Sequence, residues 1–194
     1  MQKLEPPPQD PHWVNSIKWS IRNIFEKEWK EDALTKSSLI DYLKIKDTPC
    51  LESYLLDQID FYGASLKFKI RSNTLPLDGK ISRWISDNDG TCRLCNNDVE
   101  DVKHFLFTCH SLNAIRIEEY CKLEKDLYDV NCIDIWQLFM SGNLDVKYHM
   151  SIGNVNHLCN STIEAQMFNN IFDNFCKSFI KRAWKKRAEM IALM

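Results

Sequence analysis

The stretch CRLCNNDVEDVKHFLFTCHSL, residues 92–112, holds three cysteines and two histidines within 21 residues, and the interpretation of the whole chain depends on it. Cys92 and Cys95 have the two-residue gap of a metal knuckle, in which one tight turn directs both sulfurs to a single point. Asn96 follows, and asparagine is one of the few residues other than glycine that tolerates a left-handed backbone, which such turns often need. The spacing indicates a metal site.

Two further residues complete a ligand set of the form Cys-x2-Cys-x8-His-x4-Cys, namely His104 and Cys109. Three thiolates and one imidazole suit tetrahedral zinc without strain. The acidic run before His104 predicts a short helix that carries the imidazole on its first turn and ends just before Cys109. His110 is an alternative fourth ligand, although the four-residue gap favours Cys109. We therefore expect one zinc ion held by Cys92, Cys95, His104 and Cys109.

A purely structural interpretation of these cysteines is the alternative, because free cysteine is commonly buried as a small apolar residue. A complete four-ligand set at finger-like spacing favours the metal site over that alternative. The other cysteines have spacings without a metal pattern, so we expect core or partly exposed thiols at Cys50, Cys121, Cys132, Cys159 and Cys176.

The flanking sequence is mainly helical in pattern, which predicts a mainly α fold: a helical domain with an embedded Cys-Cys-His-Cys zinc knuckle. An amphipathic helix is expected near the N-terminus from the spacing of Val14, Ile17, Ile21, Ile24 and Phe25. Another is expected from Thr48 and Pro49, as cap and first position, through Ile70. Ser111 is expected to cap a third, and the last helix is expected from about Thr162 to the C-terminus.

These patterns divide the chain into four predicted segments. We expect an extended tail at 1–12, an N-terminal helical part at 13–85, the zinc knuckle at 86–112 and a C-terminal helical part at 113–194 that forms one compact unit with 13–112.

Composition limits the classes of function. The chain has 194 residues, 44% of them hydrophobic, and a formal net charge of -2, so any cationic surface must be local. Its polar, proline-rich start lacks the apolar segment of a signal peptide, and no apolar run approaches the length of about 20 residues that crosses a bilayer. We expect an intracellular protein, in the nucleus or cytoplasm, with reduced thiols and no membrane partner.

Residues 66–116, LKFKIRSNTLPLDGKISRWISDNDGTCRLCNNDVEDVKHFLFTCHSLNAIR, extend the pattern beyond the four ligands. This region resembles the zinc-binding region at the C-terminal end of non-LTR (LINE-type) retrotransposon reverse transcriptases. The resemblance is carried by Lys69 to Asn73, Leu77, Arg83, Trp84, Cys92, Cys95, Glu100, His104 to Leu106, Cys109 and Arg116. It implies zinc binding and a part in holding RNA or DNA.

The sequence contains no Tyr/Phe-x-Asp-Asp polymerase motif and no persuasive nuclease motif, so the metal ligands of phosphoryl chemistry are not visible. We expect a binding module and not an enzyme, without a small-molecule substrate. Basic residues near the knuckle predict a cationic surface for phosphates, with Trp84 either stacking an unpaired base or packing the knuckle onto the helices, which we favour. The residues predicted to contact nucleic acid are Lys67, Lys69, Arg71, Lys80, Arg83, Trp84 and Arg93.

Two charged stretches leave other interpretations open. The basic run at 177–187 fits a phosphate-binding helix, a nuclear-localisation signal or a solvated face, the last being the usual outcome for such runs. The acidic stretch at 118–134 suits a protein partner. The alternative to nucleic-acid binding is therefore a helical protein-interaction module that zinc only stabilises.

Overall fold

The structure is a computed structural model that describes residues 11–46, 49, 51–56, 59–153 and 155–193. Within these ranges the chain forms helices joined by turns and loops, and the single β-bridge found there pairs Thr91 with Val99. The mainly α fold predicted from the sequence is confirmed. By the contacts between its residues the chain divides into two units, 1–50 and 51–194, a boundary that falls inside the predicted N-terminal helical part.

The first unit contains a long helix α1 (Pro11–Leu34), a 3-10 turn η1 (Ser37–Leu39) and a short helix α2 (Ile40–Leu43). The predicted N-terminal amphipathic helix is thus present and extends further in both directions. Because α1 begins at Pro11, residues 11–12 are helical and do not belong to an extended tail, while residues 1–10 of that prediction lie outside the described part. The side chains of its predicted apolar stripe are exposed.

The second unit holds the ligand set and consists of η2 (Ser53–Leu56), α3 (Phe61–Arg71), α4 (Asp78–Ile81), η3 (His104–Thr108), η4 (His110–Leu112), α5 (Asn113–Asp129), α6 (Ile133–Ser141), α7 (Leu144–Ile152), η5 (Asn156–Leu158) and α8 (Thr162–Ile191). Between α4 and η3 the chain is a long loop, which forms most of the segment 86–112 predicted as the zinc knuckle.

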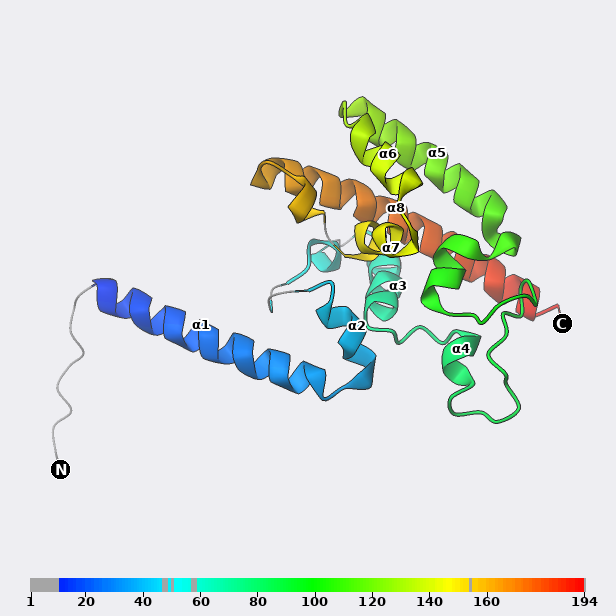
Figure 1. Cartoon of the computed structure of the whole chain (residues 1–194), viewed down its shortest axis with the longest axis horizontal. Coiled ribbons are helices and arrows are strands. Elements are labelled where there is room, and N and C mark those ends of the chain that lie inside the picture. The colour runs from blue at the N-terminus through cyan, green and yellow to red at the C-terminus, as the bar shows by residue number, and fades with distance from the viewer. Residues whose placement is uncertain (1–10, 47–48, 50, 57–58, 154, 194) are drawn as a thin grey trace. The chain divides into compact units, whose positions relative to one another are not determined.

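Helix α8 is the centre of the second unit, and α3, α5 and α7 all pack against it (Figure 1). Ser161 caps its start, because the hydroxyl accepts a hydrogen bond from the backbone N–H of Glu164. One face of α8 is buried along most of its length, through Phe168, Phe172, Phe175, Phe179, Ile180 and Ala183. The long C-terminal helix predicted from the sequence is therefore confirmed.

An aromatic cluster joins α5, α6 and α8 in the part of the unit remote from the loop. The ring of Phe139 in α6 lies with its centroid 5.4 Å from Tyr120, 5.8 Å from Phe172 and 5.9 Å from Phe175. Trp136 stacks on the same ring at 6.0 Å. We call these five residues the aromatic cluster. Burial of rings of this size contributes strongly to stability.

The helix predicted to run from Thr48 to Ile70 is shorter than expected. The 3-10 turn η2 precedes it, Ile59 is 99% exposed, and α3 starts only at Phe61. Its cap is Asp60, whose carboxylate accepts a hydrogen bond from the Gly63 N–H at 3.0 Å. A Cβ at Gly63 would lie 2.5 Å from that carboxylate, so this glycine makes room for the cap. Thr48 lies outside the described residues.

Two other helix starts differ from the prediction. Ser111 does not cap α5, since its hydroxyl donates to the Leu94 carbonyl at 2.7 Å and the helix starts at Asn113. Helix α7 was not predicted, although Asn143 is a strong capping residue and accepts hydrogen bonds from two backbone N–H groups. No helix among the described residues has both the length and the apolar character needed to cross a membrane.

Candidate metal centre

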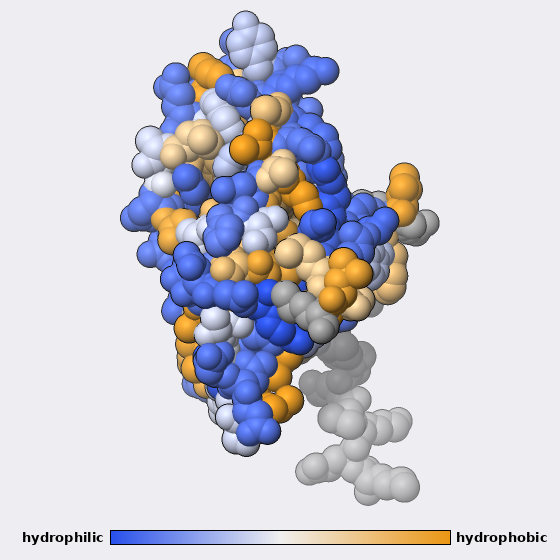
Figure 2. Space-filling view, turned by 90° about the vertical axis from the view of Figure 1, so that its right-hand side faces the viewer, coloured by the Kyte–Doolittle hydropathy of each residue, from blue (hydrophilic) through white to orange (hydrophobic). Residues whose placement is uncertain are grey.

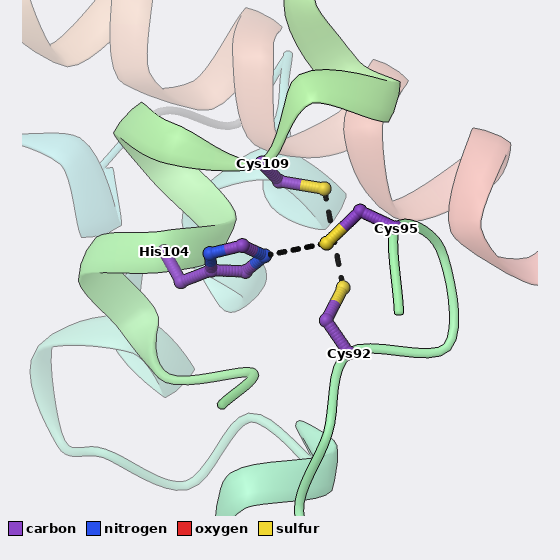
Figure 3. Close-up of side chains that lie close together, drawn as sticks. All are labelled: Cys92, Cys95, His104 and Cys109. Carbon is purple, nitrogen blue, oxygen red and sulfur yellow. Dashed lines mark hydrogen bonds between the residues drawn. The ribbon is translucent and has the colours of Figure 1, made fainter. Parts of the chain in front are cut away.

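The loop after α4 carries the first two ligand residues, Cys92 and Cys95 (Figure 3). A tight turn joins them, in which the Asn96 N–H donates to the Cys92 carbonyl at 2.7 Å. Asn96 has a φ of 53°, the left-handed conformation that the sequence predicted for it. The Cys92 N–H in turn donates to the Asp98 carbonyl at 2.8 Å, which closes the loop on itself.

The other two ligand residues belong to the turn η3 and its end. The His104 N–H donates to the side chain of Asp101 at 2.7 Å, so an acidic residue caps the start of this short helical segment. The turn is π-helical, and the Cys109 N–H donates to the His104 carbonyl at 2.8 Å. Cys109 follows the last helical residue. The predicted placement of imidazole and thiol at the two ends of one short helix is confirmed.

The four side chains converge on one point from these two segments (Figure 3). Their ligand atoms all lie within 4.8 Å of one another, with 3.9 Å between the sulfurs of Cys92 and Cys109 and 3.3 Å between Cys95 Sγ and His104 Nε2. Zinc bond lengths of about 2.3 Å to sulfur and 2.0–2.1 Å to nitrogen imply tetrahedron edges of about 3.8 and 3.6 Å. The two measured distances are close to these edges, so the four donor atoms form a plausible site for a tetrahedral metal ion. His110 is exposed and lies outside this group, whose fourth member is Cys109.

Burial strongly affects the acid–base properties of the ligands. It raises the pKa of the Cys92 thiol to about 12, although hydrogen bonds from the backbone N–H groups of Cys95 and Leu94 oppose the shift. It also raises the pKa of Cys109 and lowers that of His104. A buried thiolate needs a compensating positive charge. A bound cation would supply that charge, and the neutral imidazole that a lowered pKa favours is the form that can ligate a metal ion.

Groups around the ligands fix their orientation. His104 directs Nε2 toward Cys95, and its Nδ1 lies 3.1 Å from the Thr108 hydroxyl. The buried guanidinium of Arg116 donates to the carbonyls of Leu106 at 2.9 Å and Cys109 at 3.1 Å, so α5 holds both ends of the segment that leads into the last ligand. Partners of this kind orient metal ligands in known sites.

The turn η3 is also anchored to α8. Phe105 and Leu106 are buried, and the ring of Phe105 makes edge contacts with Phe179 at 6.4 Å and Trp184 at 6.3 Å between centroids. Phe107, two residues further on, is only half-buried.

Two of the seven residues predicted to contact nucleic acid are buried inside the second unit, which corrects their assignment to an exposed cationic surface. Lys67 forms an ion pair with Asp173 and donates to the Ser151 carbonyl at 3.2 Å. Arg71 forms two hydrogen bonds with Glu52, at 3.0 and 3.2 Å. Helix periodicity places both on the core face of α3, where their charges are balanced internally.

The remaining five predicted contact residues lie at the surface or near it. Lys69 and Arg83 are exposed, and Lys80 is half-buried. Trp84 is 73% exposed, so the packing role favoured for it from the sequence is wrong. Arg93 is exposed in part, yet its guanidinium makes two hydrogen bonds to Asp78, at 2.7 and 2.8 Å.

Figure 2 shows the face of the second unit that carries α4 and the C-terminal end of α8. Its surface is largely hydrophilic, with scattered hydrophobic residues. Much of the basic run at 177–187 is already paired: Lys181 with Asp60, Arg182 with Glu118 and Glu119. Lys177 is buried as well. The same pairs occupy the beginning of the acidic stretch at 118–134, so neither stretch is a uniform charged face.

The sequence did not single out two charged residues that support the loop, Asp78 and Arg187. Both are buried, and they meet Glu100 behind the knuckle. Their only signal in the sequence was opposite charge far apart along the chain, which does not by itself predict a contact.

Comparison of the chain with protein-family models, with curated proteins and with solved structures gave no match.

Proposed function

We propose that the chain is a zinc-stabilised module that binds nucleic acid through a surface beside the knuckle, formed by Lys80, Arg83 and Trp84 and called here the Trp84 surface. The observation that carries the proposal is the exposure of Trp84, at 73%, together with its two basic neighbours. Lys80 Nζ lies 5.6 Å from the centroid of the Trp84 ring. An exposed aromatic face beside cations suits the stacking of an unpaired base next to its phosphates.

The Trp84 surface is joined to the rest of the unit at the end of α3. Lys80 Nζ donates to the backbone carbonyl of Asn73, and the Thr74 N–H donates to the carbonyl of Lys69 at 2.7 Å. Asn73, in the turn between α3 and α4, has a φ of 50° and thus a left-handed backbone conformation. Exposed Lys69 therefore adds a further cation next to this turn. Such contacts position a nucleic-acid backbone without reading its sequence.

Zinc is the metal that the donor set suits best, because three thiolates and one imidazole in tetrahedral spacing are typical of structural zinc sites. The proposal agrees with what the resemblance of residues 66–116 to the zinc-binding region of non-LTR retrotransposon reverse transcriptases implies. We propose a binding role and not a catalytic one, since metal ligation engages the thiols and the imidazole that could otherwise act as nucleophile and base.

The test is a fluorescence anisotropy titration with a labelled single-stranded RNA, the matching single-stranded DNA and a DNA duplex, each at two salt concentrations. Affinity should fall with salt, because each neutralised phosphate contributes a slope of about -0.7 to -0.9 in the logarithmic plot. Trp84→Ala should weaken binding of the single strands by about 5- to 150-fold, since stacking contributes about 1–3 kcal/mol per base, and should change duplex binding less.

Arg83→Glu should weaken binding to all three nucleic acids. The matched control is Lys125→Glu, an identical change of charge at an exposed lysine of α5, which should bind like wild type. Binding by wild type that is absent, or that does not depend on salt, would contradict the proposal and favour a zinc-stabilised protein-interaction module.

A further inference from the structure

A cluster of buried charged side chains lies next to the loop that carries Cys92 and Cys95. Asp78, at the start of α4, and Glu100, at the end of the loop, are both fully buried. Arg187 of α8 donates to Glu100 Oε1 at 2.7 Å and Oε2 at 2.6 Å, and to Asp78 Oδ2 at 3.1 Å. Arg93 adds a second guanidinium on Asp78. Two carboxylates thus meet two guanidinium groups, and the formal charge of the group is balanced.

The cluster is continuous with the ligand residues. Glu100 Oε1 lies 3.9 Å from Cys92 Sγ, and the Glu100 N–H donates to the Gly90 carbonyl at 2.9 Å. The second carboxylate oxygen of Glu100 accepts a hydrogen bond from the Asp78 N–H at 2.7 Å. Glu100 therefore closes the segment 90–100, which contains both knuckle cysteines, against α4.

Arg187 belongs to the face of α8 that also touches the other half of the ligand set. Phe179 and Trp184 contact Phe105, which follows the ligand His104, and the Arg187 guanidinium lies 5.1 Å from the centroid of the Trp184 ring. A single helical face thus contacts both segments that supply ligands. It contacts η3 through the aromatic rings of Phe179 and Trp184, and it contacts segment 90–100 through the ion pair of Arg187 with Glu100.

We propose that Arg187 is a positioning residue for the metal centre, and that the occupancy of this centre controls the order of the last turns of α8. Without Arg187, the carboxylate of Glu100 would remain buried beside Cys92 with less positive charge to balance it. Because burial of an uncompensated charge is costly, segment 90–100 would shift away from the position that brings Cys92 and Cys95 to the ligand point.

The coupling must act in both directions, since linkage between two sites is reciprocal. If Arg187 strengthens metal binding, then metal binding stabilises the arrangement of α8 that allows the Arg187 contacts. This inference rests on metal binding by the proposed zinc centre, and it is independent of nucleic-acid binding. It deepens the proposed function by assigning a remote helix end to the control of that centre.

The first experiment measures zinc affinity by competition with a chromophoric chelator, for wild type, Arg187→Ala and Arg182→Ala. Arg182 is the matched control, because it lies on the same helix and also pairs with two carboxylates, Glu118 and Glu119, away from the loop. We expect Arg187→Ala to bind zinc about 10- to 100-fold more weakly and Arg182→Ala to bind like wild type, as supporting residues around metal ligands typically contribute that range.

Cobalt substitution supplies a readout that general destabilisation does not change. The visible spectrum of the cobalt-loaded protein reports ligand geometry, and it should shift in Arg187→Ala but not in Arg182→Ala. Arg187→Lys keeps the charge but loses the paired donors, and should give an intermediate affinity with wild-type helicity. If Arg187→Ala fails to fold, Arg187→Lys alone carries the test, with a loss of about tenfold expected.

The second experiment is hydrogen exchange of wild type with and without chelator. Removal of zinc should raise exchange in residues 184–191 more than in residues 165–176 of the same helix. Unchanged affinity and cobalt spectrum in both Arg187 variants, equal losses in Arg182→Ala, or uniform exchange along α8 would each overturn the inference. A wild-type protein that binds no zinc would instead overturn the proposed zinc centre itself.

Discussion

The two ends of the second unit are stabilised by different chemistry. At one end, α5, α6 and α8 meet in the aromatic cluster around Phe139, whose ring is fully buried. At the other end, the loop between α4 and η3 buries charged groups, Asp78 and Glu100 among them, together with the Cys and His side chains. Apolar burial is non-directional, whereas buried charges and metal ligands require defined partners at defined distances.

This contrast explains why a loop with little regular structure keeps a defined shape. The segment has one β-bridge and a π-helical turn of five residues, which give it few repeating backbone hydrogen bonds. Ligands from two separate segments converge instead, and Arg116 and Arg187 tie these segments to α5 and α8. We therefore expect the loop end to depend on its metal and the aromatic end to be nearly independent of it.

Metal removal should have the largest effect and should separate the two ends. Cys95→Ser removes one of the four ligands and should reduce the zinc content from one ion per chain to none. The loop should then open, because structural zinc contributes roughly 10 kcal/mol or more to such sites. Inductively coupled plasma mass spectrometry measures the content, and hydrogen exchange should show residues 78–109 opening while α6 stays protected. Cys121→Ser, at an exposed thiol of α5, is the control and should keep its zinc. Full zinc content in Cys95→Ser would contradict the assigned ligand set.

Phe139→Ala should produce the converse result. Loss of this ring from a filled aromatic site should lower the free energy of unfolding by about 3–5 kcal/mol, measured by urea denaturation of the zinc-loaded protein. Zinc content should stay at one ion per chain. Met140→Ala, at a partly exposed neighbour on the same helix, should cost much less. Loss of zinc from folded Phe139→Ala would show that the two ends are coupled more closely than proposed.

Local rules predicted well which Cys and His side chains come together, because the geometry of a knuckle depends on near neighbours in the sequence. The spacing of Cys92 and Cys95, and the left-handed backbone of Asn96, both followed from such rules. Helix α8 was predicted because its apolar period is long, and Ser161 marks its start. The start of α3 was missed because the apolar period continues upstream of Asp60, although the chain there is not one continuous helix.

Charge was the property that sequence patterns described least well. Lys67 and Arg71 count as cations in any stretch of sequence, yet in the fold their charges are directed inward to Asp173 and Glu52. The contact of Arg187 with Asp78 joins residues 109 positions apart. No local rule relates such distant residues, so the exposed part of a basic run and its buried part can only be distinguished once the packing is known.

The smallest of these effects concerns Glu119, which lies on α5 between the two ends and pairs with Lys122 and Arg182. Burial opposes its ionisation, but hydrogen bonds from Lys122 and Arg182 outweigh this and lower its pKa below the ordinary value of 4.5. A carboxyl whose pKa is lowered by folding stabilises the folded state at every pH above its unfolded pKa. That contribution is lost as the pH falls from about 4.5 through the lower folded pKa. Glu119→Gln should therefore be less stable than wild type by about 1–2 kcal/mol at pH 7, and the difference should shrink below pH 4.5.

The free energy of unfolding of Glu119→Gln is compared with that of wild type at each pH. Acid removes zinc from both proteins, so the effect of this loss cancels in the difference. Chemical denaturation between pH 3.5 and 7.5 supplies the two curves, and Glu118→Gln is the control, because its carboxylate contacts the same Arg182 but is 59% exposed. An exposed ion pair contributes little, so this control should stay within about 0.5 kcal/mol of wild type throughout. A stability difference for Glu119→Gln that stays constant down to pH 3.5 would mean that the ionised carboxylate is not its source, and that shape or packing of this side chain joins the two ends instead.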